Sequence, residues 1–196
     1  WRQGVMPLPD LSDTISRAQR VVLLLAASDV TLLRVKVPPL SPARLKAALP
    51  NLVEDQLIDD PSDCVIVAGG IADGLRTVAV AQRAWLDTLA RTLTALGARQ
   101  IAALPAQSCL SYQSAQSGQP GSVAVAVNEH DNAVDMTFRL SEHDGIGLAI
   151  SADPIEPAAR EVIQALCAVV PEAPVALYVP QTGLHDYQKA VNDNGA

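Results

Sequence analysis

The sequence predicts an α/β fold of mixed sheets and helices that is divided into two lobes. Short apolar runs rich in β-branched residues alternate along the chain with amphipathic helical segments. The chain has 196 residues, of which 49% are hydrophobic, and this is enough to build two cores. Residues 1–104 carry 11 basic and 10 acidic side chains, whereas residues 105–196 carry 3 and 11. We therefore expect one lobe over 1–104 and a second over 105–196.

The first lobe should begin with strands. Residues 1–18 are polar, contain two prolines and read as an irregular lead-in. The apolar run 21–27 and the β-branched run 31–37 lie on either side of Ser28-Asp29, which is a turn signal. We expect these two runs to pair as a hairpin.

An amphipathic helix is predicted over residues 41–58. Ser41 is a good N-cap residue, Pro42 suits the first helical position, and leucines follow at three- and four-residue spacing. Pro50 lies inside this segment and lacks a backbone N–H. We expect it to kink or split the helix near Leu49.

A second hairpin and a second helix complete the first lobe. Residues 64–68 and 75–81 are strand-like and flank a glycine-rich loop at 69–74. Residues 83–96 form the clearest amphipathic pattern, and Gly97 is placed to cap that helix. A strand at 101–104 follows.

The second lobe is predicted to have the order helix, three strands, helix, strand, helix. The linker 117–121, rich in glycine and serine, falls between its first helix and its first strand. The expected elements are helix 105–116, a three-stranded meander at 123–127, 133–140 and 146–150, helix 154–169, strand 175–179 and helix 182–191.

Composition excludes several classes of function. A net charge of −7 repels phosphate backbones, so we expect no nucleic-acid partner. The longest uncharged apolar stretch, residues 64–72, is about half the length of a membrane span. Cys64, Cys109 and Cys167 have no metal-binding or redox spacing and are expected to be buried free thiols in a reducing compartment.

Local motifs for catalysis are absent from the sequence. It contains no phosphate loop, dinucleotide fingerprint, zinc-protease helix or nucleophile elbow. The loop 69–74 precedes a strand rather than a helix, so a hairpin turn is favoured over a phosphate cradle. His130-Asp131 and Glu142-His143-Asp144 are interpreted as solvated turns rather than metal ligands. We therefore assign no catalytic, cofactor-binding or metal-binding residue and expect no enzyme.

Five carboxylates gather in ten residues without a Lys or Arg among them. One interpretation is a solvated helix face followed by an Asp-rich turn. The other is a docking surface for a basic partner. The candidate docking residues are Glu54, Asp55, Asp59, Asp60 and Asp63.

The region around these carboxylates resembles a known family. The similarity runs through Val-Lys-Val-Pro-Pro at 35–39, Leu-Lys-Ala-Ala-Leu-Pro at 45–50, Glu-Asp-Gln-Leu at 54–57 and the strand and helix start at 78–86. On these motifs the chain resembles the cytoplasmic domain of protein L of the type II secretion system, the GspL family. Coverage is good for residues 20–110 and weaker beyond.

The resemblance implies an actin-like, ribonuclease-H-type α/β fold without established ATPase activity. It also implies a cytoplasmic scaffold of the inner-membrane platform, anchored by one membrane helix that would lie outside this sequence and precede a periplasmic domain. Such domains recruit the secretion ATPase, protein E of the system, to the membrane for protein export. They also bind protein M and other platform proteins, and a homodimer is a possible assembly.

Two other functions remain open from the sequence. An active actin-like ATPase would need a glycine-containing phosphate loop. The comparable strand 123–127 instead runs into Asn-Glu-His-Asp-Asn at 128–132, which presents carboxylates to a nucleotide. The second alternative is a scaffold like the type IV pilus assembly protein M, which would end in the cytoplasm.

Overall fold

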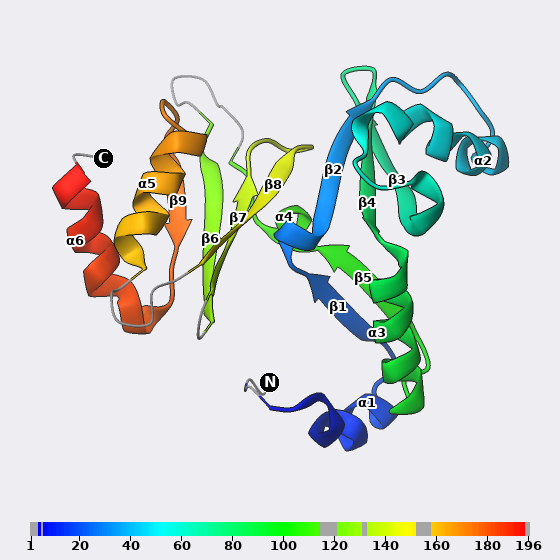
Figure 1. Ribbon diagram of the computed structural model, residues 1–196, viewed down its shortest axis with the longest axis horizontal. Coiled ribbons are helices and arrows are strands. Elements are labelled where there is room, and N and C mark those ends of the chain that lie inside the picture. Colours follow the sequence, from blue (N-terminus) through cyan, green and yellow to red (C-terminus); the bar gives the residue numbers. More distant parts are fainter. Residues whose placement is uncertain (1–3, 5, 114–120, 131–132, 152–157, 195–196) are drawn as a thin grey trace.

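The computed structural model describes residue 4 and residues 6–113, 121–130, 133–151 and 158–194. Its strands form three sheets, of two, three and four strands, with the orders β1-β5, β2-β4-β3 and β8-β7-β6-β9. Figure 1 shows the four-stranded sheet with α5 and α6 on one side of the molecule and the other two sheets with α2 and α3 on the other side. The predicted α/β class, with mixed sheets and helices, is confirmed.

The three-stranded sheet is antiparallel and carries α2 (Pro42–Val53). Its strands are β2 (Val30–Val35), β3 (Cys64–Ala72) and β4 (Leu75–Gln82). The predicted β3–β4 hairpin is confirmed, but β3 continues through Gly69 and Gly70 with a bulge. The turn is only Asp73-Gly74, both with positive φ, which suits a two-residue hairpin.

Helix α2 is not split by its internal proline. It continues as an α-helix past Pro50 to Val53, where a 3-10 turn, η3 (Glu54–Gln56), replaces the predicted last turns. Leu49 and Val53 are both fully buried against the sheet, so packing on each side of the proline holds the helical path. The predicted split near Leu49 and the predicted helix end at residue 58 are therefore wrong.

The first predicted hairpin is also wrong. β1 (Val21–Leu25) pairs in parallel with β5 (Ile101–Pro105), and β2 pairs with β4 instead. The chain between β1 and β2 forms a 3-10 turn, η2 (Ala27–Asp29), without the positive φ that a tight hairpin turn requires. Ala27 in this turn is buried, and the chain after it enters a different sheet.

Helix α3 (Arg83–Ala95) agrees with the sequence prediction. Gly97 follows it with φ +94°, and the amide of Ala98 donates to the carbonyl of Leu93, which closes the helix as expected. Trp85 packs against the core of β1 and β2. The lead-in, expected to be irregular, instead contains η1 (Leu8–Leu11) and α1 (Ser12–Arg17), because its buried Ile15 anchors a short helix beside Gly97.

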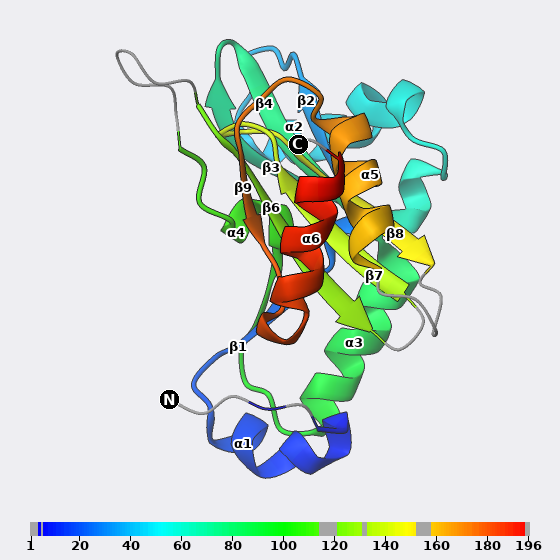
Figure 2. The same cartoon turned by 90° about the vertical axis from the view of Figure 1, so that its left-hand side faces the viewer.

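The second set of elements matches the predicted order. A meander of three antiparallel strands is followed by α5 and by a strand that pairs in parallel with β6, and α5 and α6 cover one face of this sheet (Figure 2). The bounds are α4 (Ala106–Cys109), β6 (Val123–His130), β7 (Ala133–Arg139), β8 (Gly145–Ser151), α5 (Ala159–Val169), β9 (Val175–Tyr178), η5 (Gln181–Gly183) and α6 (Leu184–Asn194).

Two helices are shorter here than predicted. α4 ends at Cys109, and the expected continuation at 114–116 and most of the linker lie outside the described residues. α5 begins at Ala159, and the predicted start at 154–157 also lies outside them. The boundary between lobes at residues 104 and 105 stays a prediction.

The turn η2 packs against β7 and β8 and joins the two groups of elements. Gly147 in β8 lies so close to the backbone of η2 that a side chain there would overlap it. The buried Gln107 donates from Nε2 to the carbonyl of Val30 at 2.9 Å, and the Ser28 hydroxyl lies 3.4 Å from Oδ1 of Asp135. We call this contact, between η2 and β8, the seam.

Candidate functional site

The five candidate carboxylates lie on one exposed segment between α2 and β3, and they divide into two groups. Glu54 and Asp55 are exposed on η3, directly after the buried Val53. The other three lie further along, on the loop that leads into η4 (Pro61–Asp63) and on η4 itself. Leu57 packs into the core between the two groups and fixes the path of the segment.

Asp59, Asp60 and Asp63 face α3 across an open hollow of about 600 Å³. The α3 side of this hollow includes Arg83 and Arg91 as well as an acidic residue, Asp87. The sequence shows no cation among the five carboxylates, whereas the fold brings two arginines beside three of them. No ion pair within 4.0 Å joins the two sides across the described residues, so the carboxylates keep their charge exposed to solvent.

Hydrogen bonds to the backbone hold this segment in shape. Oδ1 of Asp60 accepts the amide of Ser62 at 2.8 Å, and this bond lowers the pKa of the Asp60 carboxyl. Arg83 donates to the carbonyls of Ser62 at 3.2 Å and of Cys64 at 2.6 Å. The sequence pattern does not predict this role for Arg83, because it lies about 20 residues along the chain from the segment that it holds.

An isoleucine lies exposed among the carboxylates. The side chain of Ile58 is fully exposed, although isoleucine is among the residues most often buried. It lines a second hollow of about 440 Å³, together with Asp59, Gln82 and Trp85. Because both hollows share Asp59 and Gln82, they form one continuous surface, which we call the acidic face.

The cysteines differ from one another in exposure. Cys64 is buried beside the acidic face, and burial, then the charges of Asp59 and Asp63, raises the pKa of its thiol. Cys109 and Cys167 are exposed, so the predicted burial of all three thiols is wrong. Cys109 is the last residue of α4, a single helical turn that is too short to bury it. Cys167 lies on α5, whose buried side is formed by other residues.

The β6–β7 hairpin contains residues 128–132, the segment comparable to a phosphate loop of actin-like ATPases, and its structure differs from the predicted turn. Asn128, Glu129 and His130 belong to β6 and are not a turn, while residues 131–132 lie outside the described part. The hydroxyl of Tyr187 donates to Oε1 of Glu129 at 2.5 Å, and burial, with this bond, raises the tyrosine pKa. Nε2 of His130 lies 3.3 Å from Asp135. Glu129 is thus paired with Tyr187, and His130 with Asp135.

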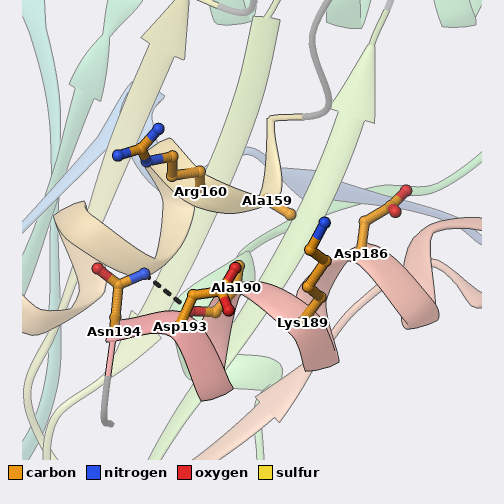
Figure 3. A pocket seen from close by; sticks show the side chains of 7 residues that line it. All are labelled: Ala159, Arg160, Asp186, Lys189, Ala190, Asp193 and Asn194. Carbon is orange, nitrogen blue, oxygen red and sulfur yellow. Dashed lines mark hydrogen bonds between the residues drawn. The ribbon is translucent and has the colours of Figure 1, made fainter.

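Another hollow lies between the start of α5 and α6 (Figure 3). It is lined by two basic and two acidic side chains, Arg160, Lys189, Asp186 and Asp193. Charges of both signs alternate around it, so it has no net preference for an anion or a cation. We assign it no function.

Within the described ranges, no helix is long and apolar enough to cross a membrane. Nor do those ranges hold a group of three or more His, Cys, Asp or Glu residues arranged for a metal ion.

Comparison with known proteins gives a family and a fold. The family model for protein L of the type II secretion system matches residues 3–119. Among solved structures, the cytoplasmic domain of EpsL, an inner membrane component of the type II secretion system of Vibrio cholerae, matches with a TM-score of 0.66 and 22% identity. The match covers 88% of this chain and 66% of that domain, so the chain spans slightly less than two thirds of its length. No curated protein sequence matches.

Two weaker structural matches are a PilM–PilN type IV pilus biogenesis complex and a Bacteroides thetaiotaomicron protein of unknown function with an actin-like ATPase fold. They have TM-scores of 0.47 and 0.43 and identities of 13% and 8%, and they cover 84% and 96% of this chain and 53% and 73% of theirs. The fold shared with the EpsL domain agrees with the predicted α/β class of mixed sheets and helices. With more than half of its residues inside the family model, the chain belongs to the protein L family of the type II secretion system.

Proposed function

We propose that this chain is a non-catalytic cytoplasmic scaffold domain of the type II secretion inner-membrane platform. In this role it recruits the secretion ATPase, protein E, to the membrane and contacts protein M. Family membership supports the role in secretion, and the EpsL relative is described as the cytoplasmic domain of an inner membrane component. Membrane attachment would come from a segment outside this sequence.

The acidic face is the proposed docking site for the ATPase, and Ile58 is the observation that carries this proposal. Interfaces place an apolar anchor at the centre and charges at the rim. Ile58 is fully exposed, and Asp59 follows it directly. A complementary partner has an apolar pocket bordered by Lys or Arg side chains.

The shape of this surface is fixed before binding. Leu57 is packed in the core, Asp60 is bonded to Ser62, and Arg83 is bonded to two carbonyls. A segment held in this way loses little conformational entropy when a partner binds.

The proposed lack of catalysis rests on the β6–β7 hairpin. Residues 128–132 contain no glycine, so the backbone has no easy way to approach a phosphate closely. Glu129 and Asp135 also place negative charge on this hairpin. Calorimetry with Mg·ATP tests this part: we expect no binding, and a Kd in the micromolar range, about −8 kcal/mol, would favour the active actin-like ATPase instead.

Binding measurements test the docking site. We would combine Ile58→Ser with Asp59→Ser and titrate the N-terminal domain of the ATPase at low and high salt. Loss of the apolar anchor should weaken binding about tenfold or more at both salt concentrations. The matched control, Glu54→Ser with Asp55→Ser, removes the same number of exposed groups away from the hollows and should change mainly the salt dependence.

Asp60 is left intact in both variants because it caps η4. Circular dichroism and urea unfolding confirm that each variant folds. The Ile58/Asp59 variant could instead bind with the same affinity as the unmodified chain at both salt concentrations. That result would favour the interpretation of the carboxylates as a solvated face, and the docking site would then lie elsewhere.

A further inference from the structure

The outer edge of β3 is an unprotected strand edge beside a cationic groove. β3 is the end strand of the β2-β4-β3 sheet, and its outer edge has no strand partner among the residues that the structure describes. Figure 1 shows β3 and α2 at the end of the molecule away from the four-stranded sheet. Its nine residues include no charged residue and no proline.

Proteins usually protect such edges with lysine, proline, a bulge or a covering element. β3 has a bulge only at its far end, between Ala68 and Ile71. The first half of the strand is regular, and Val67 on it is 56% exposed. A regular, apolar and open edge is the structure to which an extended peptide adds as a further strand.

A groove of about 490 Å³ runs between this edge and α2. Ile66, Val67 and Ala68 all line it, although successive side chains of a strand point to opposite faces. The groove therefore follows the edge of β3, where the backbone itself is reached. Leu45 of α2 and Leu40, just before this helix, form an apolar wall on the other side.

The charged residues that line the groove are both basic. They are Lys46 of α2, which is exposed, and Arg76 of β4. Arg76 donates from Nη1 to the carbonyl of Gly69 at 2.6 Å, and its buried Nε has no hydrogen-bond partner in the described residues. In a chain with a net charge of −7, two cations without a lining carboxylate select a negatively charged occupant.

We propose that the β3–α2 groove binds an extended acidic segment of a partner protein, which adds as a strand to the edge of β3. Alternate apolar side chains of that segment enter the groove against Leu40 and Leu45, and its carboxylates face Lys46 and Arg76. This surface has the opposite charge preference to the acidic face, so it serves a different segment or partner and does not depend on the proposed ATPase docking.

Synthetic peptides test both parts of the proposal. We would label three ten-residue peptides with fluorescein: valine alternating with glutamate, valine alternating with lysine, and the glutamate peptide with N-methylated backbone amides on one edge. Fluorescence anisotropy should show the glutamate peptide binding about tenfold or more tightly than the lysine peptide. N-methylation should remove the binding, because it blocks the backbone hydrogen bonds that define strand addition.

Two variants test whether the glutamate peptide binds in the groove. Lys46→Glu should weaken the glutamate peptide about fivefold or more, whereas Arg44→Glu should not, because Arg44 is an exposed cation of the same helix that does not line the groove. Both side chains are exposed, so folding should be unaffected, and urea unfolding verifies this. Equal affinity of the acidic and basic peptides, insensitivity to N-methylation, or equal effects of the two variants would overturn the proposal.

Sedimentation velocity addresses a competing occupant, a second copy of this chain. A monomer at high protein concentration leaves the edge free, as the proposal requires. A dimer that Val67→Lys dissociates would assign the edge to self-association and would also overturn the proposal.

Discussion

Replacing Gly147 by alanine should loosen the seam between η2 and β8. A Cβ at this position would lie far inside 3.0 Å of the backbone of Ala27 and Ser28, a separation that real Cβ atoms essentially never show. The atoms that it meets are main-chain atoms, so no side-chain rotation relieves the overlap. Carbon contacts are optimal at about 3.5–4.0 Å, so η2 must retreat by more than about 1 Å.

This retreat is costly because η2 is anchored on both sides. Leu25 before it and Val30 after it are buried, as is Ala27 within it. Overpacking of this kind costs about 1–3 kcal/mol, and a clash with anchored backbone belongs at the upper end of that range. With a urea dependence of about 1–3 kcal/mol per molar, the unfolding midpoint should fall by about 1 M or more.

Urea unfolding followed by circular dichroism measures the effect, and Gly70→Ala is the matched control. Gly70 lies in β3 with no atom within 4 Å of an added Cβ and with no positive φ that would strain an alanine. Its free energy of unfolding should stay within about 0.5 kcal/mol of the unmodified chain. Equal midpoints for the two variants would refute the description of the seam.

Two further predictions concern buried side chains. Tyr187→Phe removes the hydrogen bond to Glu129 and should lower the free energy of unfolding by about 1 kcal/mol, whereas Tyr178→Phe, on a side chain that is 52% exposed, should not. Because the pKa of Tyr187 is raised in the folded state, its contribution is complete below about pH 10 and is lost as pH rises above that value. The alkaline loss of stability should therefore begin at a higher pH in the Phe variant. Equal profiles of stability against pH would contradict the raised pKa of Tyr187. A thiol reagent should modify the two exposed cysteines at once and Cys64 only after unfolding; rapid reaction of all three in native protein would contradict its burial.

Local patterns predicted most elements and the strand pairs that are close in sequence, but not the partners of β1 and β2. The amphipathic helix closed by Gly97 and the β3–β4 hairpin were recognisable because their signals are local in sequence. β1 was assigned to a hairpin with β2 because adjacent strands usually pair, yet its true partner, β5, is about 80 residues away. A close approach such as that of Gly147 to η2 leaves no trace in hydrophobic periodicity, and therefore the seam was not predicted.

The candidate site shows the same limit. The cluster of carboxylates was visible as a run of like charges, and the structure places all five on the surface. Arg83 and Arg91 were not foreseen beside them, because α3 is brought to the acidic face by the β3–β4 hairpin. The exposure of Ile58 could not be read from the pattern either, since an apolar residue next to Leu57 looks like part of the core.

The seam and the acidic face should be separable by experiment. The acidic face is built from η3, η4 and the loop between them, together with β4 and α3, and η2 residues lie at one rim. The buried core beneath it comes from α2, β2, β3 and β4. Gly147 belongs to β8, and the atoms nearest to an added Cβ at this position are backbone atoms of η2. Under conditions where Gly147→Ala remains folded, we expect the ATPase domain to bind the proposed site around Ile58 and Asp59 with unchanged affinity, while the midpoint in urea falls. A parallel loss of stability and affinity would show instead that docking needs both groups of elements in their fixed arrangement, and the proposed site would then extend across the seam.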